Sequence, residues 1–298
     1  MLTLRAGPHT LSLGKRPWLM AVVNANPDSF SDPGARSVGE QLRRVEQAMA
    51  AGADIVDVGG ESAVTGRPRV AVEVEIERVV GVIQRAVGEL GALVSVDTHK
   101  VQVAAAAVAA GAAMVNDVSG LADRGVAEVC ARTGAALVIM HTRAAPGLRV
   151  HDPRRYPDVT ADVIAFLDQR MARARALGVA VEQLVLDPGP DFSKTPRQTV
   201  EVLRRISELH ALGRPLLMAI SRKDFIGALT GRPPARRLGG TLAALAHGID
   251  AGAHIFRVHD VAAAKDFLTV RDALSGRGEV DAELSLSDDL RWHGRSGR

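Results

Sequence analysis

The chain has 298 residues, 47% of them hydrophobic, which is enough for one large domain or two smaller ones. Its 37 basic and 34 acidic residues leave a net charge of +3, too small for the basic surface of a nucleic-acid-binding protein. A single cysteine excludes a disulfide framework, and no apolar run approaches the roughly 20 residues of a membrane span. We therefore expect a cytosolic protein without a signal peptide that binds neither nucleic acid nor membranes.

Short apolar runs alternate with longer segments of helical spacing along the chain. The first 17 residues are predicted to form a short hairpin that caps one end of the fold. Buried strands are then predicted at residues 19–23, 55–58, 93–96, 114–115, 136–140, 184–186, 216–220 and 255–258. Helical patterns lie between them, among them residues 38–51, 74–90, 101–110, 159–176 and 200–212. Strands that alternate with helices indicate a parallel sheet with crossover connections.

Each predicted strand ends in polar residues that a buried strand rarely carries. In chain order, these ends hold Asn24, Asp57, Asp97, Asn116, His141, Asp187, Ser221 to Lys223, and Arg257 to Asp260. In a closed (β/α)8 barrel all eight carboxyl ends open onto one face, whereas an open doubly wound sheet does not gather them. The sequence thus predicts a TIM (β/α)8 barrel over residues 1–278 and a polar, flexible tail over 279–298.

The predicted rim combines acids with cations. Asp97, Asn116 and Asp187 suit a ligand edge that carries two parallel N–H donors. Cations after strands seven and eight occupy the usual anion corner of this fold, and they suit a polyanion with Mg²⁺ shared with Asn24. Asp97 could equally cap a helix, and the Asn-Pro-Asp-Ser stretch could be a plain turn. Together the pattern indicates a site for a heterocyclic diphosphate ester.

The motifs at the strand ends resemble those of the dihydropteroate synthase family, in the order in which that family carries them. The resemblance runs from about residue 19 to residue 270. It rests on Asn24, Pro27-Asp28-Ser29-Phe30-Ser31-Asp32, Gly59-Gly60-Glu61-Ser62, Ser95-Val96-Asp97, Asn116-Asp117-Val118-Ser119-Gly120, Met140-His141, Asp187-Pro188-Gly189, Ser221-Arg222-Lys223 and Arg257-Val258-His259-Asp260-Val261.

The resemblance implies a folate-biosynthesis enzyme that joins 6-hydroxymethyl-7,8-dihydropterin diphosphate to p-aminobenzoate and releases pyrophosphate. It also implies a homodimer, and a p-aminobenzoate site that accepts sulfonamides and sulfones. By the matching motifs, the pterin would be held by Asp97, Asn116, Asp187 and Lys223. The diphosphate and Mg²⁺ would be held by Asn24, Arg257 and His259. The catalytic set would be Lys223, Arg257 and His259, because stabilising the departing pyrophosphate is the main chemical task.

One loop departs from the family pattern. Where the family usually continues Thr-Arg-Pro-Gly after Glu-Ser, this chain reads Ala63-Val64-Thr65-Gly66. Further departures are Asn26, Pro33 and Thr199, which stand where Thr, Gly and Asn are usual. Three hypotheses follow: a divergent second paralogue with weak or no synthase activity, an active synthase that tolerates the loop, or a pterin-binding or protein-interaction module without catalysis. Weakened sulfonamide and sulfone binding is expected for the altered loop.

Overall fold

The computed structural model describes residues 1–25, 38–61, 69–148 and 150–291. Within these ranges, eight parallel strands form one sheet in the order β8-β7-β6-β5-β4-β3-β10-β9. The bridge between Leu186 and Leu216 joins the two ends of this order. The strands are β3 (Trp18–Asn24), β4 (Ile55–Gly59), β5 (Val94–Asp97), β6 (Met114–Asp117), β7 (Ala136–Met140), β8 (Leu184–Asp187), β9 (Leu217–Met218) and β10 (Ile255–Val258). The predicted barrel is confirmed.

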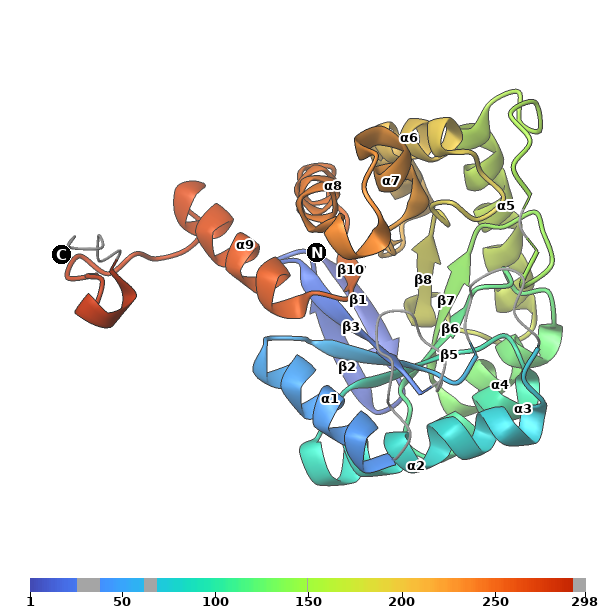
Figure 1. The fold of residues 1–298 in the computed structure, drawn as a ribbon. Helices are drawn as coiled ribbons and strands as arrows, with labels where there is room; N and C mark the ends of the chain where they lie inside the picture. The colour runs from blue at the N-terminus through green and yellow to red at the C-terminus, as the bar shows by residue number, and fades with distance from the viewer. Residues whose placement is uncertain (26–37, 62–68, 149, 292–298) are drawn as a thin grey trace.

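Helices surround the strands in chain order (Figure 1). They are α1 (Val38–Ala50), α2 (Val72–Leu90), α3 (Val101–Ala109), α4 (Arg124–Thr133), α5 (Val159–Ala176), α6 (Pro196–Arg204), α7 (Asp224–Thr230), α8 (Leu238–Asp250) and α9 (Val261–Leu274). The helix predicted over residues 200–212 is divided: α6 ends at Arg204, and the 3-10 helix η2 (Ile206–Leu212) follows. Apolar spacings of three and four residues fit both helix types over so short a segment, which is why the pattern did not separate them.

The N-terminal hairpin closes the end of the barrel from which the strands start. Strands β1 (Leu2–Ala6) and β2 (His9–Leu13) pair antiparallel. The hairpin side chains Leu4, Ala6 and Leu13 are fully buried and belong to the same apolar cluster as residues of the barrel interior. This arrangement confirms the predicted cap.

The barrel interior changes from apolar to polar along each strand. Because successive strand residues face opposite sides of the sheet, residues two apart share one side. On β4, Ile55 belongs to the interior apolar cluster, so Asp57 faces the interior one step nearer the carboxyl end. On β10, Ile255 and Arg257 repeat this pattern. The opposite faces of the strands pack with the helices in a second, larger cluster. The fold thus places polar side chains in one end of its interior.

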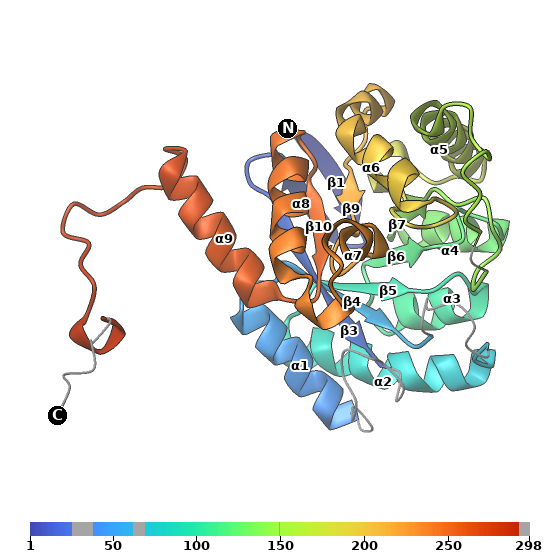
Figure 2. The ribbon, with the colours of Figure 1, turned by 45° about the horizontal axis from the view of Figure 1, so that its top comes forward.

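The segment after α9 lies outside the barrel. Residues 279–291 are all exposed, and the ribbon carries them away from the strands in both views (Figures 1 and 2). A single 3-10 turn, η4 (Asp288–Leu290), lies in this segment. Among the helices of the described ranges, none combines the length and the apolar character that crossing a bilayer requires.

Candidate active site

A hydrogen-bonded ion-pair cluster occupies the barrel interior at the carboxyl ends of the strands. We call this end the upper end, and its opening the mouth of the barrel. The guanidinium of Arg257 donates from Nε to Asp57 Oδ2 at 2.6 Å and from Nη2 to Asp97 Oδ2 at 2.8 Å. Asn116 Nδ2 donates to the same Asp57 oxygen at 3.1 Å. The Asp57 side chain is 0% exposed and that of Arg257 only 20%. The carboxyl ends of β4, β5, β6 and β10 are therefore tied together inside the mouth.

Buried acceptors in this cluster remain without donors. Among the described residues, Asp57 Oδ1, Asn116 Oδ1 and Ser95 Oγ are buried and have no hydrogen-bond partner. Asp57 and Ser95 lie side by side in the register of β4 and β5, and Asp97 and Asn116 in that of β5 and β6. Because buried polar atoms in native proteins are almost always paired, these oxygens indicate a place where a ligand or water donates hydrogen bonds.

The electrostatics of Asp97 are set by competing neighbours. Burial raises the pKa of its carboxyl, the guanidinium of Arg257 opposes that rise, and the nearby carboxylate of Asp57 adds to it. The alternative role of Asp97 as a helix cap is not what the structure has. Helix α3 follows Lys100, whose backbone N–H donates to Thr98 Oγ1, while Asp97 pairs with Arg257.

Asp187, the last residue of β8, is held by a tight turn. Gly189 N donates to Asp187 Oδ1 at 2.7 Å, and His141 N donates to the Asp187 carbonyl at 2.9 Å. Gly189 has a φ of +63°, and a Cβ there would lie 2.1 Å from the carbonyl oxygen of His141, so glycine is required. Burial raises the pKa of Asp187 to about 6, and the Gly189 hydrogen bond limits that rise.

A fully buried lysine supports this turn. Lys194 Nζ lies 2.7 Å from His141 Nδ1, 2.9 Å from the Gly189 carbonyl and 3.1 Å from the Phe192 carbonyl, so three acceptors surround an ammonium with three donors. Burial lowers the pKa of Lys194 to about 7 and that of His141 to about 3. The neutral imidazole therefore accepts from Lys194 and donates from Nε2 to Asp162 Oδ2 at 2.9 Å.

The cations predicted for the anion corner lie at the ends of β9 and β10. Lys223 precedes α7, and its Nζ lies 4.4 Å from the ring centre of Phe192. His259 Nδ1 lies 3.0 Å from Ser221 Oγ. Burial and the charge of Arg257 lower the pKa of His259 to about 4, so its imidazole is neutral at pH 7. Asn24, the last residue of β3, lies beside Gly59 in the register with β4.

Lys100 connects the loops after β4 and β5. Its Nζ donates to Glu61 Oε2 at 2.5 Å, to Glu75 Oε2 at 2.6 Å and to the Val70 carbonyl at 2.6 Å. Thr98 Oγ1 donates to the other oxygen of the buried Glu75. The departures from the family pattern at Ala63, Val64 and Thr65, together with Asn26 and Pro33, lie outside the described residues. Lys100 therefore binds residues on either side of the altered loop.

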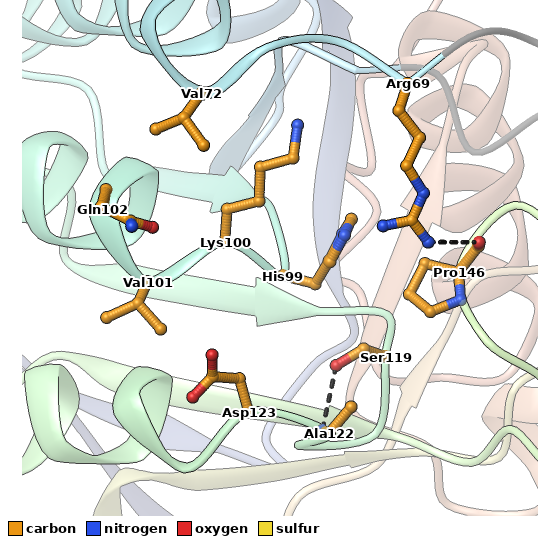
Figure 3. A pocket seen from close by; sticks show the side chains of 10 residues that line it. All are labelled: Arg69, Val72, His99, Lys100, Val101, Gln102, Ser119, Ala122, Asp123 and Pro146. Atoms are coloured by element: carbon orange, nitrogen blue, oxygen red, sulfur yellow. Dashed lines mark hydrogen bonds between the residues drawn. The ribbon is translucent and has the colours of Figure 1, made fainter.

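A cavity of about 380 Å³ opens beside the mouth (Figure 3). Its lining comes from the loops after β5 and β6 and from the segments around Arg69 and Pro146. In Figure 3, Arg69 reaches across to the Pro146 carbonyl at 3.0 Å, and His99 lies between Arg69 and Ser119. None of the six predicted ligand-binding residues lines this cavity, so it is distinct from the ion-pair cluster.

The sequence-predicted residues share one end of the barrel, but direct contact is limited to some of them. Asp97 and Arg257 bond directly, and Asn116 joins them through Asp57. Asp57 was not among the predicted site residues, although its position two residues after the interior Ile55 placed it there. Asp187 is the last residue of β8, Lys223 directly precedes α7 in the loop after β9, and His259 directly follows β10. The arrangement places buried hydrogen-bond acceptors beside cations at one end of the barrel.

Known proteins share this fold and sequence. A family model described as "pterin binding enzyme" matches residues 20–259. The dihydropteroate synthase of Synechocystis is 38% identical over 274 residues, which are 91% of this chain and 94% of that protein. A Mycobacterium tuberculosis protein named inactive dihydropteroate synthase 2 is 42% identical over 270 residues, or 88% of this chain and 84% of its own.

Solved structures agree with the sequence relatives. The dihydropteroate synthase of Xanthomonas albilineans, solved with 4-aminobenzoic acid, has a TM-score of 0.84 and 40% identity, covering 92% of this chain and 98% of its own. Its similarity extends over the barrel and far beyond the short motifs at the strand ends. From these matches and the shared fold, the chain belongs to the dihydropteroate synthase family of pterin-binding enzymes.

Proposed function

We propose that the chain binds 6-hydroxymethyl-7,8-dihydropterin diphosphate in the upper barrel and has weak or no dihydropteroate synthase activity. One observation supports the proposed binding of the pterin. The buried acceptors Asp57 Oδ1 and Asn116 Oδ1 have no donors, and they lie beside the ion-paired Asp97 and Arg257. A flat ring with several N–H donors would satisfy these oxygens, and an apolar ligand would leave them unpaired.

The pterin and its diphosphate would bind to adjacent groups of residues at the carboxyl ends of the strands. Asp97, Asn116 and Asp187 would accept hydrogen bonds from the ring, and Lys223 would donate to it. Arg257 and His259 would meet the diphosphate. Arg257 is already paired with Asp57 and Asp97, so the phosphate oxygens would share its guanidinium with two carboxylates. His259 is neutral in the free protein, and a bound anion would raise its pKa.

The residues at this end of the barrel fit a Mg²⁺ ion whose ligands come mainly from the diphosphate of the substrate. The described residues contain no group of three or more His, Cys, Asp or Glu side chains arranged to hold a metal. Mg²⁺ in phosphoryl-transfer sites keeps water and phosphate ligands and needs only one or two protein oxygens. Asn24 would supply one such oxygen at the end of β3. When bound, the ion would neutralise charge on the diphosphate.

The reaction of the family is a substitution at the methylene carbon of the pterin. The amine nitrogen of p-aminobenzoate forms the new bond, the carbon–oxygen bond breaks, and pyrophosphate departs with the bonding electrons. The nitrogen then loses one proton. Arg257 and Lys223 would stabilise the leaving charge in a site with little water, where such interactions are strongest. The residues for this half of the chemistry are present.

Weak activity is proposed because of the second substrate. The loop Ala63-Val64-Thr65 lacks the hydroxyl, guanidinium and proline that the family usually carries there. Loss of one charge-assisted contact costs roughly 1.5–3 kcal/mol, on the order of tenfold to a hundredfold in rate. The 42% identity to a relative named inactive supports the same proposal. Sulfonamides and sulfones, as p-aminobenzoate analogues, would bind weakly for the same reason.

A two-substrate assay with pyrophosphate release tests the proposal. We expect turnover at least a hundredfold below an ordinary synthase assayed in parallel, and a rise when Ala63→Thr, Val64→Arg and Thr65→Pro are combined. The matched control adds Lys223→Met to the restored loop and should remove the gain. Ordinary turnover by the unmodified chain would instead establish an active synthase, the alternative favoured by the intact cluster of Asp97, Asn116 and Arg257.

Calorimetry with the pterin diphosphate tests the third hypothesis, a pterin-binding or protein-interaction module without catalysis. Tight binding without turnover, even after loop restoration, would identify a pterin-binding module without catalysis. No binding at all would contradict the proposed pocket. We further propose a homodimer with one barrel of residues 1–278 in each subunit, which sedimentation velocity and a chain truncated after residue 278 would test.

A further inference from the structure

Asp191 links the loop after β8 to the first turn of α7. Its Oδ2 accepts hydrogen bonds from Asp224 N at 2.6 Å and from Phe225 N at 3.3 Å. Its other oxygen, Oδ1, accepts from Thr199 Oγ1 at 3.1 Å, and its backbone N donates to the same hydroxyl at 3.0 Å. One carboxylate therefore joins the β8 loop, α6 and α7.

The backbone at Asp191 is held in a conformation that side chains rarely adopt. Its φ is +65°, in the left-handed region, where Asp and Asn are the most tolerated residues after glycine. Ser193, two residues later, has a φ of +52°. A left-handed non-glycine residue usually costs of order 1 kcal/mol or more and persists where surrounding contacts hold it. The four hydrogen bonds of Asp191 are such contacts.

Asp191 and Arg237 both hold the peptide group that joins Lys223 to Asp224. Lys223 directly precedes Asp224, whose N–H binds Asp191. On its carbonyl side, Arg237 Nη1 donates to the Lys223 carbonyl at 3.1 Å and to the Arg222 carbonyl at 2.8 Å. The Lys223 ammonium lies over Phe192, the residue next to Asp191. The same loop thus carries both the carboxylate and the ring that place this ammonium.

We propose that Asp191 is a positioning residue that holds the Lys223 ammonium over the mouth of the barrel, where it would meet the pterin ring. The inference rests on the proposed function, since Lys223 is there a ligand-binding residue. Asp191 does not touch the ligand in this scheme. It acts through the start of α7 and through its negative charge beside Lys223.

The charge of Asp191 matters because Lys223 lies among several ionisable groups. Burial lowers the pKa of Lys223, and Asp191 is the first of the neighbouring charges that oppose this fall. The ionisable groups around it are Asp187, Asp191, Asp224, Lys194, Arg257 and His259, of which the His259 imidazole is neutral at pH 7. Removal of the Asp191 charge should therefore make the Lys223 ammonium easier to deprotonate.

The test measures pterin diphosphate affinity by calorimetry between pH 6.5 and 9.5. Asp191→Asn keeps the size and tolerates a positive φ, but it loses the charge. At pH 6.5 we expect the variant to bind pterin diphosphate about as tightly as the unmodified chain does. Its affinity should begin to decline at a lower pH than that of the unmodified chain, and at pH 9 it should be weaker on the order of tenfold. Asp191→Gly relieves the backbone and should show the same shift even if it is more stable, which separates positioning from stability.

The matched control is Asp224→Asn. It removes an equal charge one residue from Lys223, but the Asp224 carboxylate pairs with Arg237 at 3.0 Å and contributes less to the charge around Lys223 than Asp191 and Asp187 do. Its pH profile should stay close to that of the unmodified chain. An equal shift in Asp224→Asn, or no shift in either Asp191 variant, would overturn the proposal.

A second readout is independent of the ligand. The chain has five lysines, and reductive methylation with ¹³C-formaldehyde allows NMR titration of each, with Lys223→Arg assigning the signal. Asp191→Asn should lower the pKa of Lys223 by a measurable fraction of a unit or more. If that shift is seen but the unmodified chain binds no pterin diphosphate, the proposed function fails and the positioning role stands. An unchanged Lys223 titration refutes the positioning role itself.

Discussion

The lower and upper halves of the barrel interior are built from the same strands, yet they have opposite chemistry. The lower half, at the amino-terminal ends of the strands, is apolar and closed by the N-terminal hairpin, and it includes Met20, Ile55, Met114, Val185, Leu217 and Ile255. Two residues further along four of these strands stand Asp57, Asn116, Asp187 and Arg257. A distance of about 7 Å along a strand therefore separates an apolar layer from a charged one.

This difference separates stability from binding. Burial of apolar side chains stabilises the fold by roughly 25 cal/mol per Å² removed from water. Charged groups that are withdrawn from water pay a desolvation cost, which ion pairing offsets only in part. We therefore expect substitutions in the lower layer to change stability alone, and substitutions in the upper layer to change ligand affinity, with stability effects of either sign.

The largest effect is expected from Arg257→Met. Methionine keeps an unbranched apolar stem but lacks the guanidinium, so the buried Asp57 and the nearby Asp97 lose their cation. Breaking a buried pair by removing one partner typically costs about 3–5 kcal/mol. Urea unfolding should show this loss, and calorimetry should show no pterin diphosphate binding by the folded fraction. A variant as stable as the unmodified chain would contradict the central role of this ion pair.

Ile255→Ala is the matched substitution on the same strand. Ile255 is fully buried among the interior apolar residues, two positions before Arg257. Removing its outer carbons should cost about 2–5 kcal/mol of unfolding free energy, depending on how far the cavity collapses. Pterin diphosphate affinity, measured under conditions where the variant remains folded, should not change. A loss of affinity comparable to that of Arg257→Met would show that the two layers are not independent.

The same two-residue spacing explains how much of the site the sequence could predict. Asp97, Asn116 and Asp187 follow apolar runs, Arg257 stands within one, and closure of the barrel brings such strand ends onto one face. Asp57 was not selected because, unlike Arg257, it lies outside the motifs that carry the family resemblance, and a lone acid in a buried run is also compatible with a structural role. Its contact with Arg257 arises because β4 and β10 lie on either side of β3 in the sheet, although the two residues are 200 positions apart in the sequence.

The contacts made by loop residues could not be predicted from sequence patterns. Lys194 stands in a polar turn, and nothing in its spacing indicates that it is fully buried against His141. Asp191 likewise resembles an ordinary turn residue, because Pro, Asp and Ser dominate turns generally. Its role depends on a left-handed φ and on the approach of α7. Both are properties of tertiary packing that periodicity does not encode.

Asp187→Asn should stabilise the protein while it weakens binding. Burial raises the pKa of Asp187 to about 6. The Asp187 carboxyl therefore holds its proton more readily in the folded state than in the unfolded chain, and the free energy of unfolding falls as pH rises from about 4 to 6. An amide does not titrate, and we expect a gain of about 1–3 kcal/mol at pH 7.5 that disappears near pH 4. Urea unfolding at the two pH values and calorimetry at pH 7.5 would check both parts.

The smallest effect concerns His254, at the amino-terminal end of the barrel. Its Nδ1 accepts from Leu216 N at 3.2 Å, and burial, followed by the neighbouring His210, lowers its pKa to about 4. Because this pKa lies below the unfolded value, the folded state binds fewer protons, and stability falls as pH drops from about 6.5 toward 4. Between pH 7.5 and 5 the unmodified chain should lose about 1–2 kcal/mol more than His254→Asn, allowing for partial solvent screening. Pterin diphosphate affinity should be equal in both proteins at each pH, because His254 lies at the end of the barrel that we expect to affect stability alone. Unequal affinities would show that the two ends are energetically coupled and would contradict their separation.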